Sequence, residues 1–408
     1  MLNYMIYRHK RTRNRGCGMD TYLCINNKRI PCYLNKVDFN TDILACALVV
    51  KSGSLQDEIP GTAHILEHVM IENQVIKNWD WDTIDRRAHT DFYETTYYFK
   101  TNKNIFNIGL EFIESIVDGL WLNEKNFELV KKNIVDEYNS LLKKDEFLIL
   151  NALLKNSAFE NHIPIGTLET IEKVTFKDIK SYYEKNYLSD NIFIVISGYV
   201  SLCELKKTVY KDINFIEEEL NIKKIAEEYP RLVFQNDINN VLPNNDNYIL
   251  MFFNINKNQN PIFNKNINQI TEEALLIECL QAILNEYTKE FTKCVKCNLV
   301  QVSFGYYLIK VVIIKEDSVN FATESIIKKI LSLNVNMYFQ TITEIIENVH
   351  IEQKIGTNLG IILEEQINSF LYCEKYDDKD ESNSIFCAER IINKLDEILH
   401  SNKYRVII

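Results

Sequence analysis

Hydrophobic and polar positions along the chain follow two different periods, which predict strands in some segments and helices in others. Alternating or continuous apolar runs predict strands at 22–32, 43–51, 95–100 and 192–200. Apolar residues spaced three and four apart predict amphipathic helices at 106–121, 126–147 and 176–186. The predicted stripe of the helix at 126–147 consists of Leu129, Val130, Asn133, Ile134, Glu137, Tyr138, Leu141 and Leu142.

The second half of the chain repeats this plan loosely. Its patterns predict strands at 248–255 and 403–408, a strand pair at 299–314, and helices at 271–284, 320–333 and 340–369. A charged stretch at 212–229, which ends at Pro230, has the composition of a linker. The chain is therefore predicted to have an α+β fold with a flexible basic N-terminus at 1–18, a first domain at 19–211, a linker at 212–230 and a second domain at 231–408.

Composition narrows the class of protein. Of the 408 residues, 46% are hydrophobic and 25% charged, which are values of a globular protein. The net charge of −11 argues against a nucleic-acid partner, and no apolar run is long enough for a membrane span. Five basic residues between Arg8 and Arg15 lack a following apolar core, so they are no secretory signal. We expect a frayed N-terminus there, with a basic targeting arm as the alternative.

The cysteines favour a reducing compartment. The ten cysteines are scattered and show no framework spacing, which predicts free thiols and a cytoplasmic location. One C-x-x-C pair, Cys294 and Cys297, has no second pair near it in sequence. Because a structural zinc needs four ligands, we expect no second metal at this pair.

The chemistry is concentrated in the segment His64-Ile65-Leu66-Glu67-His68, which reads H-x-x-E-H, the inverted zinc-peptidase signature. On a helix, His64 and His68 lie four positions apart on one face and can bind one Zn²⁺. Glu67 is placed to take a proton from water without being a ligand. Pro60-Gly61-Thr62 supplies a break and an N-cap before this helix. A solvated helix face with two histidines is the alternative for the motif alone.

The surrounding residues resemble the pitrilysin/insulinase family of zinc peptidases, whose members show V, G-S and E, in this order, before G-x-A-H-x-L-E-H. The positions that fit are Val50, Gly53, Ser54, Glu58, Gly61, Ala63, His64, Leu66, Glu67 and His68. Ala88–Tyr98 is similar to the family's N-A-x-T-x-x-x-x-T-x-Y-Y strand, and His162–Gly166 to its H-P-x-G segment. Tyr187, Asn191 and the apolar run to Gly198 match a later block, so the resemblance covers roughly residues 20–205.

The resemblance implies two pseudo-repeated domains of the mitochondrial-processing-peptidase/LuxS-like metallohydrolase fold, each a mixed sheet flanked by helices. It also implies a Zn²⁺ cofactor with a third ligand, a Glu on a later helix. Glu137 fits that position best, and Glu146 is the alternative. Asp136 points about 100° away from Glu137 around the helix. The first domain is then the zinc-binding catalytic domain, and the second a degenerate copy, since its helix at 271–284 has no histidine.

The strand Ala88–Tyr98 is where the family pairs an extended peptide substrate by β-augmentation. The resemblance thus assigns Arg87, Ala88, His89 and Thr90 to substrate binding. Arg87 stands where the family usually has Asn, and it could bind a substrate carbonyl, favour an acidic side chain, or be a plain surface residue. For His89, a strand side chain is the expected role in preference to a second metal ligand.

The second half departs from active members of the family, which carry an Arg and a Tyr there to stabilise the oxyanion. Cys294 and Gln301 occupy those positions in the alignment. Loss of oxyanion donors typically costs about 10²–10³ in rate, so we expect the chain to be poor or inactive by itself. Because the family works as a clamshell of four domains, we expect a zinc endopeptidase half that forms a heterodimer with a related half-size subunit, or else a homodimer. The expected substrates are peptides, including leaders or precursors of ribosomally made peptides. The alternatives are a silent peptide-binding scaffold subunit and mitochondrial-type presequence processing.

Overall fold

The computed structural model describes eleven parts of the chain. These are residues 19–37, 41–72, 84–209, 213–216, 237–239, 248–254, 267–303, 306–316, 322–349, 388–400 and 404–407. The predicted basic N-terminus at 1–18 lies outside the described residues, as do positions 217–230 of the predicted linker and 350–369 of the predicted helix at 340–369. Ile213–Ile216, which also falls in the predicted linker, forms a strand of the first sheet.

The first half is built on a seven-stranded sheet with the order β4-β5-β3-β6-β2-β1-β7. Its strands are β1 Met19–Ile25, β2 Lys28–Lys36, β3 Ile43–Val50, β4 Asp85–Thr90, β5 Thr95–Asn102, β6 Ile192–Gly198 and β7 Ile213–Ile216. All neighbours are antiparallel except β2 and β6, which are parallel. The central strands β3 and β6 are almost wholly buried, as their continuous apolar runs predict.

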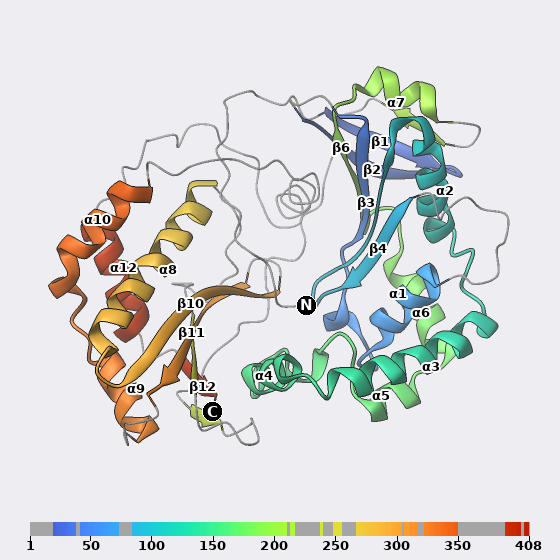
Figure 1. Cartoon of the computed structure of the whole chain (residues 1–408). Helices are drawn as coiled ribbons and strands as arrows, with labels where there is room; N and C mark the ends of the chain where they lie inside the picture. The colour runs from blue at the N-terminus through green and yellow to red at the C-terminus, as the bar shows by residue number, and fades with distance from the viewer. Residues whose placement is uncertain are drawn as a thin grey trace.

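Helices cover this sheet (Figure 1). They are α1 Thr62–Ile71, α2 Phe106–Val117, α3 Glu124–Leu141, α4 Asp145–Leu154, α5 Leu168–Lys173, α6 Phe176–Asn186 and α7 Leu202–Thr208. Helix α1 packs on both α3 and α6. This packing brings the H-x-x-E-H helix next to the later helix that carries Glu137.

The second half repeats the arrangement with a five-stranded sheet in the order β10-β11-β9-β12-β8. Its strands are β8 Asp237–Asn239, β9 Tyr248–Asn254, β10 Thr292–Ser303, β11 Tyr306–Lys315 and β12 Tyr404–Ile407. Its helices are α8 Ile267–Thr288, α9 Thr323–Leu331, α10 Phe339–Val349 and α12 Ala388–His400. The order matches β4-β5-β3-β6-β2 strand for strand, and β8 and β12 are parallel, as β2 and β6 are. The predicted α+β fold of two pseudo-repeats is confirmed.

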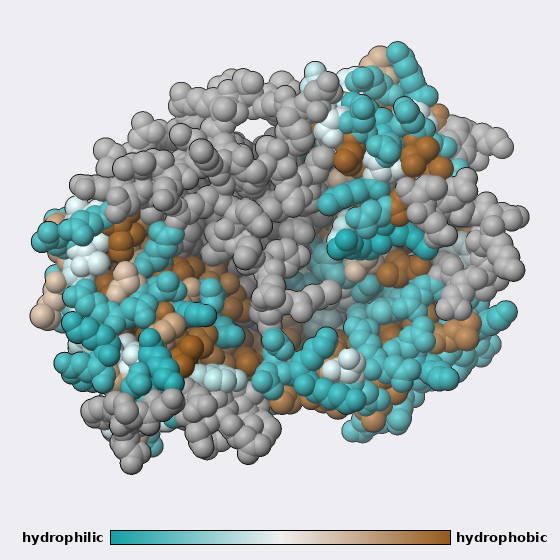
Figure 2. All heavy atoms as spheres, in the orientation of Figure 1, coloured by the Kyte–Doolittle hydropathy of each residue, from teal (hydrophilic) through white to brown (hydrophobic). Residues whose placement is uncertain are grey.

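Three segments that were predicted or matched as single elements each consist of two. The single strand predicted at 22–32 is a hairpin of β1 and β2, turned by Asn26 and Asn27 with φ of 48° and 66°. Ala88–Tyr98 is likewise a hairpin of β4 and β5, because residues 91–94 turn the chain. The helix predicted at 126–147 is α3 followed by α4, and Leu129 and Leu142 of its predicted stripe are 50% and 42% exposed. The surface over α3 and α5 is mostly hydrophilic, and apolar spots are scattered over it (Figure 2).

The two halves meet at α4 and β12 (Figure 1). A buried apolar cluster spans them, with Phe92, Phe159, Leu250, Phe252 and Ile407 among its members. At its edge the Arg405 side chain of β12 is fully buried. Its Nη1 donates hydrogen bonds to the carbonyl oxygens of Ala152, Leu153 and Lys155 at 2.7, 2.6 and 2.9 Å. A cation therefore caps the carboxyl end of α4, where the helix dipole favours positive charge.

Strand β10 lies at one edge of the second sheet, and α8 reaches it with two amide side chains. Asn285 donates from Nδ2 to the Val295 carbonyl at 2.8 Å and accepts from the Val295 N–H at 2.7 Å. Gln281 Oε1 accepts from the Cys297 N–H at 2.9 Å. The two amides are four residues apart on α8, so they lie on the same face and meet alternate residues of β10.

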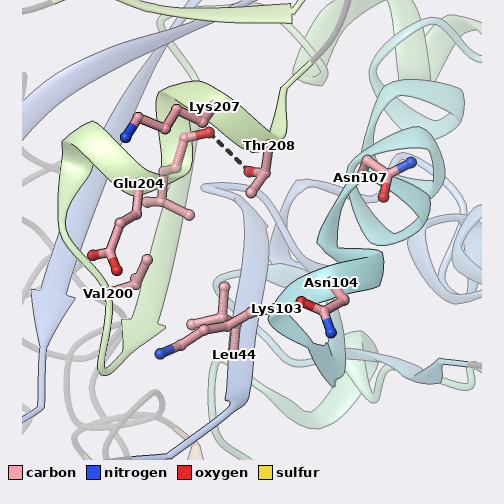
Figure 3. A pocket seen from close by; sticks show the side chains of 9 residues that line it. Leu44, Lys103, Asn104, Asn107, Val200, Glu204, Lys207 and Thr208 are labelled. Carbon is pink, nitrogen blue, oxygen red and sulfur yellow. Dashed lines mark hydrogen bonds between the residues drawn. The ribbon is translucent and has the colours of Figure 1, made fainter.

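A surface pocket of about 500 Å³ opens between the start of β3, the start of α2 and α7 (Figure 3). Leu44 and Val200 form part of its lining, with Lys103, Lys207 and Glu204 around them. Leu44 lies near the start of β3, whereas the chain leads to α1 from the other end of that strand, which is about 20 Å away at ~3.3 Å per residue. None of the lining residues belongs to the H-x-x-E-H helix.

Candidate metal centre

Helix α1 begins at a point fixed by Gly61 and Asp57. Gly61 is the N-cap with φ of 97°, a left-handed conformation that favours glycine. The Asp57 carboxylate accepts hydrogen bonds from the Gly61 and Ala63 N–H groups, both at 2.9 Å. Burial raises the pKa of Asp57 to about 8, although the bonds from these backbone groups act to lower it. The start of α1, and with it the position of His64, is therefore held by a buried carboxyl group.

The two imidazoles of α1 converge. His64 and His68 lie one helical turn apart, and their Nε2 atoms are 3.3 Å from each other. Among the described residues, the His/Cys/Asp/Glu group close enough to hold a metal ion is His64, Glu67 and His68, whose ligand atoms lie within 4.8 Å of one another. Burial and the neighbouring His68 lower the pKa of His64 to about 3. His64 is thus neutral near pH 7, which is the form that binds metal ions.

Glu137 approaches this pair from α3. Its Oε2 lies 3.5 Å from His68 Nε2, and its side chain is 41% exposed. Two atoms that are each ~2.1 Å from a tetrahedral zinc ion are about 3.4 Å apart. The separations of 3.3 Å and 3.5 Å therefore suit one shared ion. The alternative candidate, Glu146, is exposed on α4.

Glu67 lies behind the histidines and is almost inaccessible, with 3% exposure. Its Oε2 accepts a hydrogen bond from the Thr90 hydroxyl at 2.9 Å. Burial raises the pKa of Glu67, and the positive potential of His68 and the bond from Thr90 only partly oppose this. A carboxyl group with a raised pKa can both accept and return a proton near neutral pH.

The predicted substrate residues lie on β4, an edge strand of the first sheet. Ala88 and Thr90 pair with β5, and Thr90 also touches Glu67. The Arg87 side chain is exposed and bonds to Asp85 at 3.3 Å. His89 Nε2 lies 3.6 Å from Glu94 Oε1. The edge strand therefore runs directly beside the buried acid.

Sequence reasoning missed three polar residues around this centre. Glu72 contacts His68 Nδ1 at 2.6 Å, and Asn133 donates to Glu72 at 2.8 Å. Glu94 is fully buried, and burial raises its pKa to about 7. The spacing of Glu72, four residues after His68 on the same helix, is the signal that could have revealed it.

The predicted second-half positions lie on β10. Cys294 is half-buried and Cys297 is buried, and burial raises the pKa of the Cys297 thiol. An odd spacing on a strand places the two side chains on opposite faces, so they cannot share an ion. Gln301 is paired through its backbone with Tyr307.

Residues 35–170 match the family described as insulinase (peptidase family M16). The chain is 25% identical over 195 residues to the zinc protease PqqE of Helicobacter pylori, a match that covers 44% of each protein. The chain thus spans less than half the length of this curated relative.

The fold is shared with solved structures of the same size. The first half of the periplasmic protease PqqL from Escherichia coli has a TM-score of 0.66 and 15% identity, covering 98% of this chain and 92% of that one. An inactive M16 peptidase domain from Pseudomonas fluorescens has a TM-score of 0.67 and 12% identity, covering 95% and 97%. At these identities the likeness shows the fold alone. The same fold also occurs in the domain from Pseudomonas fluorescens that is described as inactive.

Proposed function

We propose that the chain is a zinc-dependent endopeptidase subunit, because residues 35–170 match the insulinase (M16) peptidase family. The observation that carries this proposal is the convergence of three ligand atoms with a buried acid. His68 Nε2 lies 3.3 Å from His64 Nε2 and 3.5 Å from Glu137 Oε2. The Glu67 carboxylate lies beside the two histidines. A solvated helix face would not bury Glu67 or draw a carboxylate from another helix.

In this proposal His64, His68 and Glu137 hold Zn²⁺. The bound ion would supply Lewis-acid chemistry, lowering the pKa of water and polarising a scissile carbonyl. Glu67 accepts the proton of the attacking water and returns it to the leaving amine. The Thr90 hydroxyl donates to one Glu67 oxygen at 2.9 Å and so fixes the direction of the carboxylate.

The substrate of this site is a peptide in extended conformation. Strand β4 pairs with β5 on one side, so its other side can add a peptide strand through backbone hydrogen bonds. Such pairing tolerates many sequences, which suits processing of a leader or precursor peptide. Arg87 and His89 then stand next to alternate side chains of the peptide and bias its sequence.

The active assembly is a two-chain chamber in which a related half-size subunit supplies the Arg/Tyr pair. Cys294 and Gln301 in place of that pair support a heterodimer over a homodimer. The second candidate is a silent scaffold subunit, which the inactive relative of the same fold favours. The intact H-x-x-E-H segment supports the catalytic reading.

A cytoplasmic location is also part of the proposal. All seven cysteines among the described residues are free thiols, which suits a reducing compartment. Among the described helices, none has an apolar stretch long enough to cross a bilayer.

Metal analysis combined with a peptidase assay tests the function. We expect one zinc per chain, loss of that zinc in His64→Ala, and cleavage of internally quenched peptides once a related half-size subunit is added. A matched control is Glu146→Gln, which should retain the zinc. Full zinc retention in His64→Ala would refute the metal site, and a zinc-loaded pair that binds peptides without cleaving them would establish the scaffold.

A further inference from the structure

The side chain of Glu72 bridges the two helices that form the metal centre. Glu72 is the C-cap of α1, and its N–H donates to the His68 carbonyl at 2.8 Å. Its side chain turns back toward the same residue, so that Oε1 lies 2.6 Å from His68 Nδ1. A carboxylate can only accept, so His68 Nδ1 carries the hydrogen of this bond.

The second Glu72 oxygen is bound from α3. Asn133 Nδ2 donates to Oε2 at 2.8 Å. Asn133 is four residues before Glu137 on that helix, so both side chains lie on the face turned toward α1. Glu137 in turn approaches His68 Nε2 to 3.5 Å. The contacts Glu72–Asn133 and His68–Glu137 both join α1 to α3, and together with the two helices they form a closed ring.

The ring determines which nitrogen of His68 is available. In the neutral ring with its hydrogen on Nδ1, the lone pair is on Nε2, the atom that faces His64 Nε2 and Glu137. Outer carboxylates of this kind fix the tautomer and the ring orientation of metal-binding histidines. His64 differs from His68, because its Nδ1 is buried without a hydrogen-bond partner among the described residues.

We propose that Glu72 is a positioning residue, which holds His68 in its metal-binding tautomer and, through Asn133, sets the spacing of α1 and α3. This inference rests on the zinc site proposed above. A carboxylate suits the position, because it accepts at both oxygens. Glutamine offers one oxygen and one NH₂, so in Glu72→Gln the NH₂ group faces either His68 or Asn133. Facing His68 it donates to Nδ1 and favours the opposite tautomer, and facing Asn133 it requires that amide to turn over and accept.

The test is the zinc affinity of the purified chain, measured by competition with a chromophoric chelator at constant pH. Loss of an outer partner typically lowers metal affinity about 10–100-fold, and we expect Glu72→Gln to fall in that range. Asn133→Ala should show a smaller loss, and the double variant should bind no more weakly than Glu72→Gln, because the residues act in one ring. Glu169→Gln is the matched control, since Glu169 is an exposed carboxylate paired with Lys173 on α5.

A second measurement, of the His68 tautomer, is made on metal-free protein. The ¹⁵N chemical shifts of the His68 ring in metal-free protein should show the Nδ1–H tautomer in the original chain and a mixture in Glu72→Gln. Unchanged affinity and an unchanged tautomer in Glu72→Gln would overturn the inference while leaving the zinc site intact. Absence of zinc binding by the original chain, or binding that survives His64→Ala, would instead overturn the proposed function. Should Glu72→Gln fail to fold, unchanged affinity in Asn133→Ala would overturn the inference.

Discussion

Arg405→Met should separate the unfolding of the two halves. Each hydrogen bond to a charged group typically contributes about 1.5–3 kcal/mol, and Arg405 makes three, from β12 to the carboxyl end of α4. Methionine is also long and apolar, so the substitution leaves little cavity and removes the cost of burying a charge, which is several kcal/mol. The unpaired carbonyl groups dominate, and we expect a net loss of about 2–4 kcal/mol.

Urea denaturation followed by two probes measures this effect. The three tryptophans, Trp79, Trp81 and Trp121, all precede the second half in sequence, and Trp121 is buried in the first sheet's core, so tryptophan fluorescence follows the first half. Far-ultraviolet circular dichroism reports on both halves. In Arg405→Met the two curves should shift to lower urea and cease to coincide. Arg390→Met on the exposed side of α12 is the control. Coincident curves with a loss under about 0.5 kcal/mol would refute the role of Arg405.

Three further results are expected. Glu67→Gln should retain zinc and fold but lose peptide hydrolysis in the competent assembly, because the amide cannot accept a proton; normal turnover would remove Glu67 as the base. Cys294→Ser and Cys297→Ser should each leave the zinc content at one per chain, and a drop in either would place metal at β10. Asp57→Ala should lower thermal stability by about 1–2 kcal/mol, since it removes the acceptor for two N–H groups of α1; an unchanged melting temperature would show that Gly61 alone sets the helix start.

Element type was predictable where periodicity was long and uniform. The helix predicted at 176–186 is α6, with the same bounds. The strand predicted at 43–51 is β3, which ends one residue earlier. The hairpins were missed because their turns give weak signals. Asn26-Asn27 adopts positive φ without the glycine that usually marks such a turn. Apolar residues flank that turn closely, at Ile25 and Ile30, so the two strands were predicted as one.

The candidate site was predictable in its local part. The spacing of His64, Glu67 and His68 follows from one helix, and their convergence needs no tertiary information. Glu137 and its alternative Glu146 could be ranked only by resemblance, since their distance from α1 depends on how α3 packs. Asn133 was missed because an exposed amide shows its role only when Glu72 lies across from it.

The amide side chains of α8 affect how the chain meets other strands. An edge strand exposes N–H and C=O groups that can pair with another molecule. The N–H and C=O groups of Val295 are already occupied by Asn285, and the N–H group of Cys297 is occupied by Gln281. A peptide or a second copy of the chain that adds to β10 must first displace both amides. The second sheet is thereby protected against edge-to-edge association, and its counterpart of β4 is closed at these two residues.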